Sequence, residues 1–213
     1  MALLPQSVIA EIEGVTLEHY EKNAESFWQG TRDHDVSQNI NAFLGALPQN
    51  KILDVLDLGC GPGRDLQAFR QFGHRPTGVD GSQAFCDMAR QHGDCPVLHQ
   101  QFSGLALGAD AFDGIYANAA LFHVPSQLLP SVLVACHSAL RPKGILFTSN
   151  PRGNSEGWQG NRYGHFMEFA DSCTYLDQAG FTILDHYYRP EGKPRNEQPW
   201  LAIVCQKRES SLP

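Results

Sequence analysis

The sequence predicts an α/β fold in which helices cover both faces of a mostly parallel sheet. From residue 50 onward, short apolar runs alternate with segments of helical periodicity, an order typical of parallel strands joined by crossover helices. Most of these runs are apolar on both faces, as strands between two helix layers are. A loop of roughly ten residues joins the last two runs and is too short for a parallel crossover, which predicts an antiparallel hairpin. We therefore expect a three-layer sandwich around a seven-stranded sheet.

Each expected strand is an apolar run bounded by turn residues. The seven runs cover residues 52–59, 76–80, 96–102, 112–121, 144–150, 181–188 and 200–207. Helices are expected between them over 65–72, after Ser82 as N-cap, over 126–140 and over 167–179. In the first of these helices, Leu66, Phe69 and Phe72 share one face and should belong to the core.

Two further helices are expected ahead of the first strand. In the segment TLEHYEKNAESFWQG, apolar side chains such as Leu17, Tyr20 and Ala24 recur at three- and four-residue steps. This spacing is typical of an amphipathic helix. A second helix is expected over 36–47, because Pro48 cannot continue it.

The composition excludes several classes of protein. The chain has 213 residues, 42% hydrophobic and 18% charged, which allows one sizeable core. A formal net charge of −7 argues against binding bulk nucleic acid, although a local basic pocket remains compatible with it. There is no run of about 18 apolar residues and no basic N-terminal segment, so we expect neither a membrane span nor export. Six scattered cysteines without a CxxC pair indicate reduced thiols and a cytoplasmic location.

The stretch LDLGCGPGRDL, residues 56–66, reads as a strand end, a glycine turn and the start of a helix. Ligands of open parallel sheets bind beyond the carboxyl ends of the strands, where glycines permit close approach of the backbone. Dinucleotides and S-adenosylmethionine are both bound at such turns. The spacing here is GxGxG rather than GxGxxG, and Pro62 removes a backbone donor that a pyrophosphate would use. The turn therefore disfavours a dinucleotide. Asp80, at the next strand end, suits the ribose of either cofactor and does not discriminate between them.

Over residues 50–207 the chain resembles the class I S-adenosylmethionine-dependent methyltransferases, which have a Rossmann-like fold. The resemblance rests on Asp57 followed by the turn GCGPG, on Asp80, on the segment FDGIYAN over 112–118 and on LRPKG over 140–144. The expected terminal hairpin is also characteristic of that family. The order and spacing of these motifs together make the resemblance specific, and it implies S-adenosylmethionine as cofactor.

The resemblance also implies which residues hold the cofactor. The methionine portion would lie against Asp57, Gly59, Cys60, Gly61 and Gly63, with Ala117 and Asn118 at its amino end, and the ribose against Asp80 and the adjacent Gly81. One position departs from the family pattern. Where an Asp and a hydrophobic residue often contact the adenine, this chain has Gln101 and Phe102. The Gln101 amide can still both accept and donate a hydrogen bond.

Methyl transfer itself requires no obligatory catalytic side chain. The methyl group on a sulfonium is already an activated electrophile, so the protein mainly has to hold a nucleophile in line in a dry pocket. A base is needed only if the acceptor arrives protonated, and His123 and His34 are the candidates because histidine titrates near neutrality. Structural histidines are nevertheless common. No CxxC or HxxxE-type cluster suggests a metal.

The acceptor is expected to be a small molecule, and an acidic one is favoured. The segments 149–166 and 187–200 leave strands at the cofactor edge and are rich in aromatic and basic residues. The candidate acceptor-binding residues are Arg152, Trp158, Arg162, Tyr163, Arg189 and Arg195. An arginine fork suits a carboxylate or phosphate, and an aromatic ring can cover an apolar part. The alternative for each arginine is solvation or pairing with Glu156, Glu191 or Glu197.

We expect a single domain over 1–213, with residues 1–48 as a helical lid on the core 50–207. Tyr20, Trp28 and Arg32 would contact the cofactor from this lid, because something must shield methyl transfer from water. Three other functions stay open: a protein or RNA methyltransferase, an NAD-dependent oxidoreductase and a non-catalytic protein that binds S-adenosylmethionine. The sequence does not indicate the oligomeric state.

Overall fold

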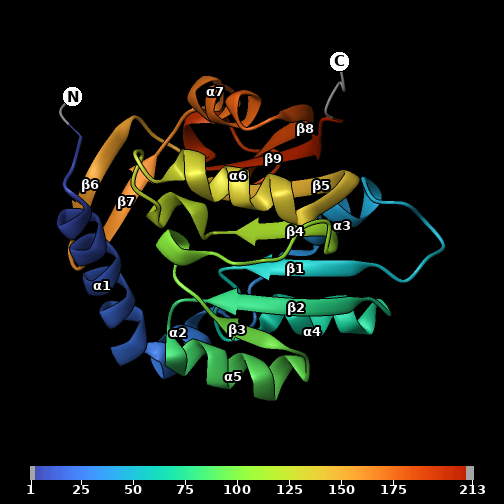
Figure 1. The fold of residues 1–213 in the computed structure, drawn as a ribbon, viewed down its shortest axis with the longest axis horizontal. Coiled ribbons are helices and arrows are strands. Elements are labelled where there is room, and N and C mark those ends of the chain that lie inside the picture. The colour runs from blue at the N-terminus through green and yellow to red at the C-terminus, as the bar shows by residue number, and fades with distance from the viewer. Residues whose placement is uncertain (1–2, 210–213) are drawn as a thin grey trace.

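A computed structural model describes residues 3–209 of the chain. Its main sheet has seven strands in the order β3-β2-β1-β4-β5-β9-β8 (Figure 1). The strands are β1 (Asp54–Leu58), β2 (Arg75–Asp80), β3 (Val97–His99), β4 (Phe112–Asn118), β5 (Leu140–Pro151), β8 (Phe181–Arg189) and β9 (Trp200–Lys207). The first five are parallel, whereas β9 is antiparallel to both β5 and β8. The predicted Rossmann-like sandwich with its terminal antiparallel hairpin is therefore confirmed.

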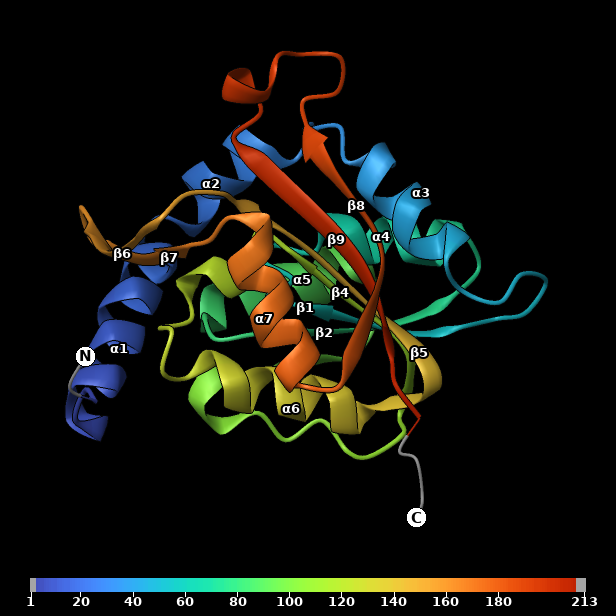
Figure 2. The same cartoon turned by 90° about the horizontal axis from the view of Figure 1, so that it is seen from above.

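Two helix layers cover the sheet, as Figure 2 shows from above. The helices that follow the first strand are α4 (Arg64–Gln71), α5 (Gln83–Gly93), α6 (Leu129–Ala139) and α7 (Phe169–Gln178), and α3 (Ser37–Gly45) precedes it. One apolar cluster joins α3 and α4 to the sheet, and a second joins α6 and α7 to its other face. Along β1, Val55 belongs to the first cluster while Leu56 and Leu58 belong to the second. Strand alternation thus explains why these runs are apolar throughout.

The N-terminal helix begins earlier than predicted and is broken. The structure has α1 (Gln6–Lys22) and α2 (Ala24–Thr31), where the sequence predicted one helix. Asn23 lies between them with non-helical dihedral angles, φ −114° and ψ 16°, and its side-chain amide donates to the His19 carbonyl at 2.7 Å. Asparagine favours such local bonds over helix continuation. Figure 1 shows α1 at the side of the sheet toward which the arrowheads of β1, β2 and β4 point.

The segment after β5, for which the sequence predicted no strand or helix, forms a hairpin. Its strands are β6 (Ser155–Gln159) and β7 (Arg162–Phe166), joined by Gly160 and Asn161. Gly160 has a φ of 61°, which glycine adopts without strain. A Gly-Asn pair between two runs is a hairpin signal, so this element was detectable from the sequence.

One expected core residue is exposed. Leu66 and Phe69 are fully buried, but Phe72 is 57% exposed. The reason is that α4 ends at Gln71, so Phe72 lies at the C-cap and leaves the buried face. Within residues 3–209, no helix is long and apolar enough to cross a membrane.

Candidate active site

The carboxyl ends of β1, β2 and β4 border a cavity of about 640 Å³, which α1 and α2 cover. Most residues that the sequence singled out line it. They are Tyr20, Trp28, His34, Asp57, Gly59, Cys60, Gly61, Asp80, Gly81, Gln101, Phe102, Asn118, His123, Arg162 and Arg189. A single cavity therefore unites the predicted cofactor segments with two of the four arginines that were predicted to bind the acceptor.

The glycine turn positions the Asp80 carboxylate. The backbone N–H of Gly61 donates to Asp80 Oδ2 and that of Ser82 to Oδ1, each at 2.9 Å. At Gly59, φ is 75° and a Cβ atom would collide with Ala120, so only glycine fits there. Burial raises the pKa of Asp80, and the backbone donors oppose that shift. Each carboxylate oxygen has spare acceptor capacity, which suits a ligand with neighbouring hydroxyl groups.

Asp57 is a buried carboxyl with a free oxygen. It is 2% exposed, its Oδ2 has no hydrogen-bond partner, and it forms no ion pair within residues 3–209. Burial raises its pKa well above the ordinary value, and the nearby Asp65 carboxylate raises it further. A cationic group entering the cavity would stabilise the ionised form of Asp57.

A chain of polar contacts fixes Asn118 beside this carboxyl. Its amide donates to Asp65 Oδ2 at 3.2 Å, and its Oδ1 accepts from Asn39 of α3 at 2.9 Å. Asp65 in turn pairs with Arg64 through two bonds of 2.6 and 3.0 Å. Arg64 and Asp65 line the cavity, although the sequence analysis did not name them as site residues. Their place directly after the glycine turn was the available signal.

Hydrogen bonds at both ring nitrogens fix the position of His123. Nδ1 lies 2.6 Å from the Tyr163 carbonyl, which can only accept, so Nδ1 carries the proton. Nε2 lies 2.7 Å from the Tyr20 hydroxyl and must accept from it. Burial lowers the pKa of His123 to about 4 and raises that of Tyr20. The histidine is therefore neutral, and the Tyr20 oxygen stands between it and any molecule that would approach Nε2.

The arginines divide into two groups. Arg162 and Arg189 line the cavity, and neither forms an ion pair within the described chain. Arg162 lies 3.5 Å from the Tyr20 hydroxyl, and Arg189 donates to the Asp35 carbonyl at 3.1 Å. Arg152 pairs instead with Glu168 at 2.8 Å and also donates to two backbone carbonyls. Arg195 lies over the Tyr188 ring, outside the cavity.

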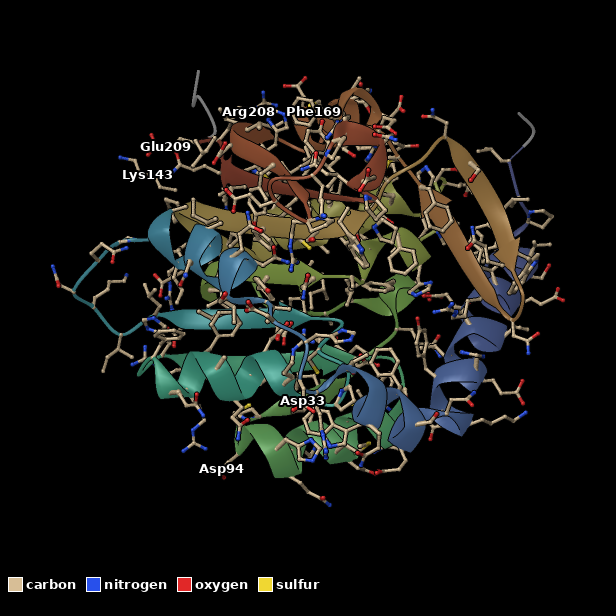
Figure 3. All side chains as sticks on the ribbon, turned by 180° about the vertical axis from the view of Figure 1, so that it is seen from behind. Asp33, Asp94, Lys143, Phe169, Arg208 and Glu209 are labelled. Carbon is tan, nitrogen blue, oxygen red and sulfur yellow. The ribbon has the colours of Figure 1, made fainter. Side chains whose placement is uncertain are left out.

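Five other predicted residues do not line the cavity. Gly63 caps α4 and packs on Ala89, where a Cβ would lie 2.8 Å from a backbone atom. Ala117 is fully buried in the core, and Trp158 is 48% exposed on β6. Arg32 pairs with Asp33, which Figure 3 labels on the segment after α2. Tyr163 binds through its backbone to His123 and to Thr16 of α1, so it supports the site rather than lining it.

The two N-terminal helices are attached to the core by specific contacts. Trp28 stacks on His92 of α5 with ring centroids 4.2 Å apart. Glu21 accepts from Ser82 Oγ at 2.6 Å and from the backbone N–H of Ala84, so it caps α5 from a distant helix. The Ser82 hydroxyl accepts from the Phe85 N–H, which confirms the predicted N-cap. Glu21 gave no signal in the sequence, since a glutamate in a helix is ordinarily solvated.

These features define a protein that binds a nucleotide-bearing cofactor at the carboxyl edge of a parallel sheet. Comparison with known proteins then identifies the family to which this protein belongs. A family model described as "Methyltransferase domain" matches residues 55–144. The ubiquinone biosynthesis O-methyltransferase of Histophilus somni is 32% identical over 160 residues, which span 67% of this chain and 65% of that protein. The protein of the same name from Haemophilus ducreyi is 30% identical over 183 residues, spanning 69% and 72% of the two chains.

A solved structure agrees over nearly the whole chain. The 1,6-didemethyltoxoflavin-N1-methyltransferase of Burkholderia thailandensis, crystallised with 1,6-didemethyltoxoflavin and S-adenosylhomocysteine, superposes with a TM-score of 0.77. The match covers 98% of this chain and 94% of that one at 23% identity, which shows a common fold. The chain belongs to the class I S-adenosylmethionine-dependent methyltransferases, as the motifs of its sequence predicted. The cofactor of this family is S-adenosylmethionine, and the NAD-dependent alternative is wrong.

The residues at the cavity fit this cofactor. The Asp57 carboxyl at the cavity wall suits the ammonium group of the methionine portion, and Asp80 suits the two ribose hydroxyls. Residues 3–209 contain no group of three or more His, Cys, Asp or Glu side chains placed to hold a metal ion.

Proposed function

We propose that this protein transfers a methyl group to a small molecule that carries a negative charge. The observation that supports this most directly is the pair Arg162 and Arg189, which line the cavity and form no ion pair within residues 3–209. A guanidinium group that faces a cavity without a carboxylate partner is suited to a carboxylate or phosphate of a ligand. Trp200 and Phe122 line the same cavity and can cover an apolar part of the acceptor.

The chain contributes mainly by binding and exclusion of water. S-adenosylmethionine, when bound, supplies a methyl group that is already activated on a positively charged sulfur. The helices α1 and α2 cover the cavity, and we assign them the role of a lid that shields the reaction from solvent. The predicted lid, residues 1–48, is too long, because α3 packs on the sheet as part of the core. Arg162 and Arg189 would hold the acceptor so that its nucleophilic atom points toward the methyl-bearing end, beside Asp57 and Asn118.

A base is required only for an acceptor that brings a proton. His123 can act through Tyr20, since Tyr20 can take a proton on its oxygen while it passes its own to Nε2 of His123 at 2.7 Å. His34 is exposed at the cavity and is the second candidate. In this proposal His123 acts at one remove from the acceptor, and burial, which lowers its pKa to about 4, makes it a weaker base than the predicted histidine that titrates near neutrality.

The experiment is a methyl-transfer screen with isotopically labelled S-adenosylmethionine. Small carboxylic and phosphorylated acceptors are compared with their neutral esters and amides. Arg162→Met and Arg189→Met should raise the KM for an anionic acceptor by about tenfold each, because a charged hydrogen bond is lost. Arg208→Met is the matched control, since Arg208 pairs with Asp177 outside the cavity. Equal methylation of the neutral analogues would overturn the proposal of an anionic acceptor.

Two alternatives are outcomes of the same screen. Labelling of a protein or RNA fraction, with no small-molecule product, would mean that the compact domain acts on a macromolecule. Binding of S-adenosylhomocysteine without any product would indicate a non-catalytic role. We also propose a reducing, cytoplasmic environment, which agrees with the six free cysteines.

A further inference from the structure

Glu13 of α1 is a buried carboxylate that the protein leaves half satisfied. It is 7% exposed, and its Oε1 accepts from the backbone N–H of Ser103 at 3.0 Å. Its Oε2 has no hydrogen-bond partner, and Glu13 forms no ion pair within residues 3–209. A buried charged oxygen without a donor is costly, and such atoms ordinarily have a partner. Glu13 also lines the cavity, so its carboxylate lies at the wall against which a ligand would bind.

The position of Glu13 along α1 indicates which part of the ligand it meets. Glu13, Leu17 and Glu21 follow at intervals of four residues and share one face of the helix. Leu17 lies against Gly81, beyond the end of β2, where a Cβ would come within 2.7 Å of it. Glu13 instead contacts Ser103, in the short helix Phe102–Gly104 that follows β3. This face of α1 therefore runs across the ends of β2 and β3, which are the lower strands of the sheet in Figure 1.

A cofactor bound at Asp57 and Asp80 would extend along the sheet edge in the same direction as this face of α1. Its methionine end fits between β1 and β4 at Asp57, and its ribose fits Asp80 at the end of β2. The sheet order β3-β2-β1-β4 then leaves the base on the β3 side, beside Phe102 and within reach of α1. Gln101, the residue that the sequence placed at the adenine, is exposed, and its side chain makes no hydrogen bond within the described chain.

We infer that Glu13 recognises the exocyclic amino group of the adenine and thereby sets the base specificity of the cofactor site. The inference rests on the proposed binding of S-adenosylmethionine in this cavity. A carboxylate is an acceptor only, so it accepts the amino N–H of adenine and repels the carbonyl oxygen of a 6-oxopurine. The Ser103 N–H occupies one acceptor position of the Glu13 carboxylate, which leaves its other acceptor positions for the base.

The test is calorimetric titration with S-adenosylhomocysteine and with S-inosylhomocysteine, in which a carbonyl oxygen replaces the amino group. The native protein should bind the adenosyl ligand about 100-fold more tightly. Glu13→Gln should weaken the adenosyl ligand about tenfold and strengthen the inosyl ligand, because the new amide can donate to its oxygen. Glu11→Gln, an exposed change on the same helix, is the matched control and should alter neither affinity.

Each outcome decides the inference. The inference would be overturned if Glu13→Gln kept the native preference for the adenosyl ligand or lost affinity equally for both ligands. It would also be overturned if Gln101→Ala, and not Glu13→Gln, reversed that preference. Thermal unfolding followed by circular dichroism identifies a variant that fails to fold, and Glu13→Asp then provides a second test, since the shorter acid should also reduce the preference. A native protein that binds neither ligand would refute cofactor binding in the cavity itself, which is a different failure.

Discussion

The two edges of the sheet differ in whether their charged side chains form ion pairs within the protein. At the amino edge, where β1, β2, β4 and β5 begin, Arg141 bridges Asp54 and Asp113 at 2.9 and 2.8 Å. Arg75 pairs with Asp54 at 2.6 Å, and Lys51 with Asp113 at 2.8 Å. Figure 3 shows a further pair of this kind, Lys143 and Glu209, on the side of the molecule away from α1.

The carboxyl edge, where β1, β2 and β4 end, contains charges that the protein itself does not neutralise. Asp57 and Glu13 each have a buried oxygen without a partner, and Arg162 and Arg189 form no ion pair among residues 3–209. Asp35 is the carboxylate near Arg189, whose charge adds to the Ser37 hydrogen bonds that lower the pKa of Asp35. Both edges are built from the same strands and similar residue types. The difference teaches that carboxylates without an ion pair gather at the carboxyl edge, where a ligand can neutralise them, although the pair of Arg64 and Asp65 also lines that cavity.

The largest expected effect is at the carboxyl edge. Asp80→Ala should weaken S-adenosylhomocysteine binding at least about 100-fold, because two hydrogen bonds from ribose hydroxyls to a charged acceptor are lost. Calorimetric titration measures this, and the melting temperature shows whether the glycine turn survives. Retention of native affinity in a folded variant would remove Asp80 from the site.

The matching change at the amino edge should act on stability alone. Arg141→Met leaves Asp113, which is only 7% exposed, with one cation fewer and should lower the free energy of unfolding by about 2 kcal/mol. Urea denaturation measures it, and the affinity for S-adenosylhomocysteine should stay at the native value. Impaired binding at unchanged stability would contradict the contrast between the edges.

Acid should weaken the amino edge in a defined range. The Arg75 guanidinium lowers the pKa of Asp54 to about 2, while partial burial opposes the shift. The folded-state pKa thus lies below the unfolded value, so the stabilisation is complete above about pH 4 and is lost as the pH falls through 2. It amounts to about 2 kcal/mol. The free energy of unfolding of Asp54→Asn should therefore fall less over this range, and parallel curves would refute the assignment.

The smallest expected effect concerns the lid. Trp28→Ala removes the stacking on His92 and should weaken S-adenosylhomocysteine about fivefold, which corresponds to about 1 kcal/mol. Trp158→Ala is the control, because Trp158 lies on the hairpin outside the cavity. Unchanged affinity in a folded Trp28 variant would mean that α2 does not act as a lid.

The sequence predicted the parts of the fold that depend on local pattern. Buried parallel strands are continuous apolar runs, so all seven were found, and the short link between β8 and β9 predicted their antiparallel pairing. Strand ends in a parallel sheet meet at one edge, which is why Asp57, Asp80 and Asn118 could be expected to lie together.

Tertiary partners were beyond the reach of such patterns. Arg152 and Arg162 lie in the same segment, yet Glu168 binds the first while the second faces the cavity. Glu13 and Glu21 occupy helical positions that local periodicity treats as solvated, and their partners are some 60 to 90 residues away in the sequence. Only the placement of α1 across the sheet edge brings these glutamates to their partners.

That placement of α1 also bears on the kinetics of the reaction. After methyl transfer, S-adenosylhomocysteine has to leave a cavity over which Glu13, Leu17 and Tyr20 of α1 lie. If α1 must detach for this, turnover cannot exceed its rate of opening, however fast the chemical step is. The backbone amides of residues 6–22 would then exchange with deuterium more slowly in the presence of bound product, and variants that loosen α1 would release product faster while they bind it less tightly.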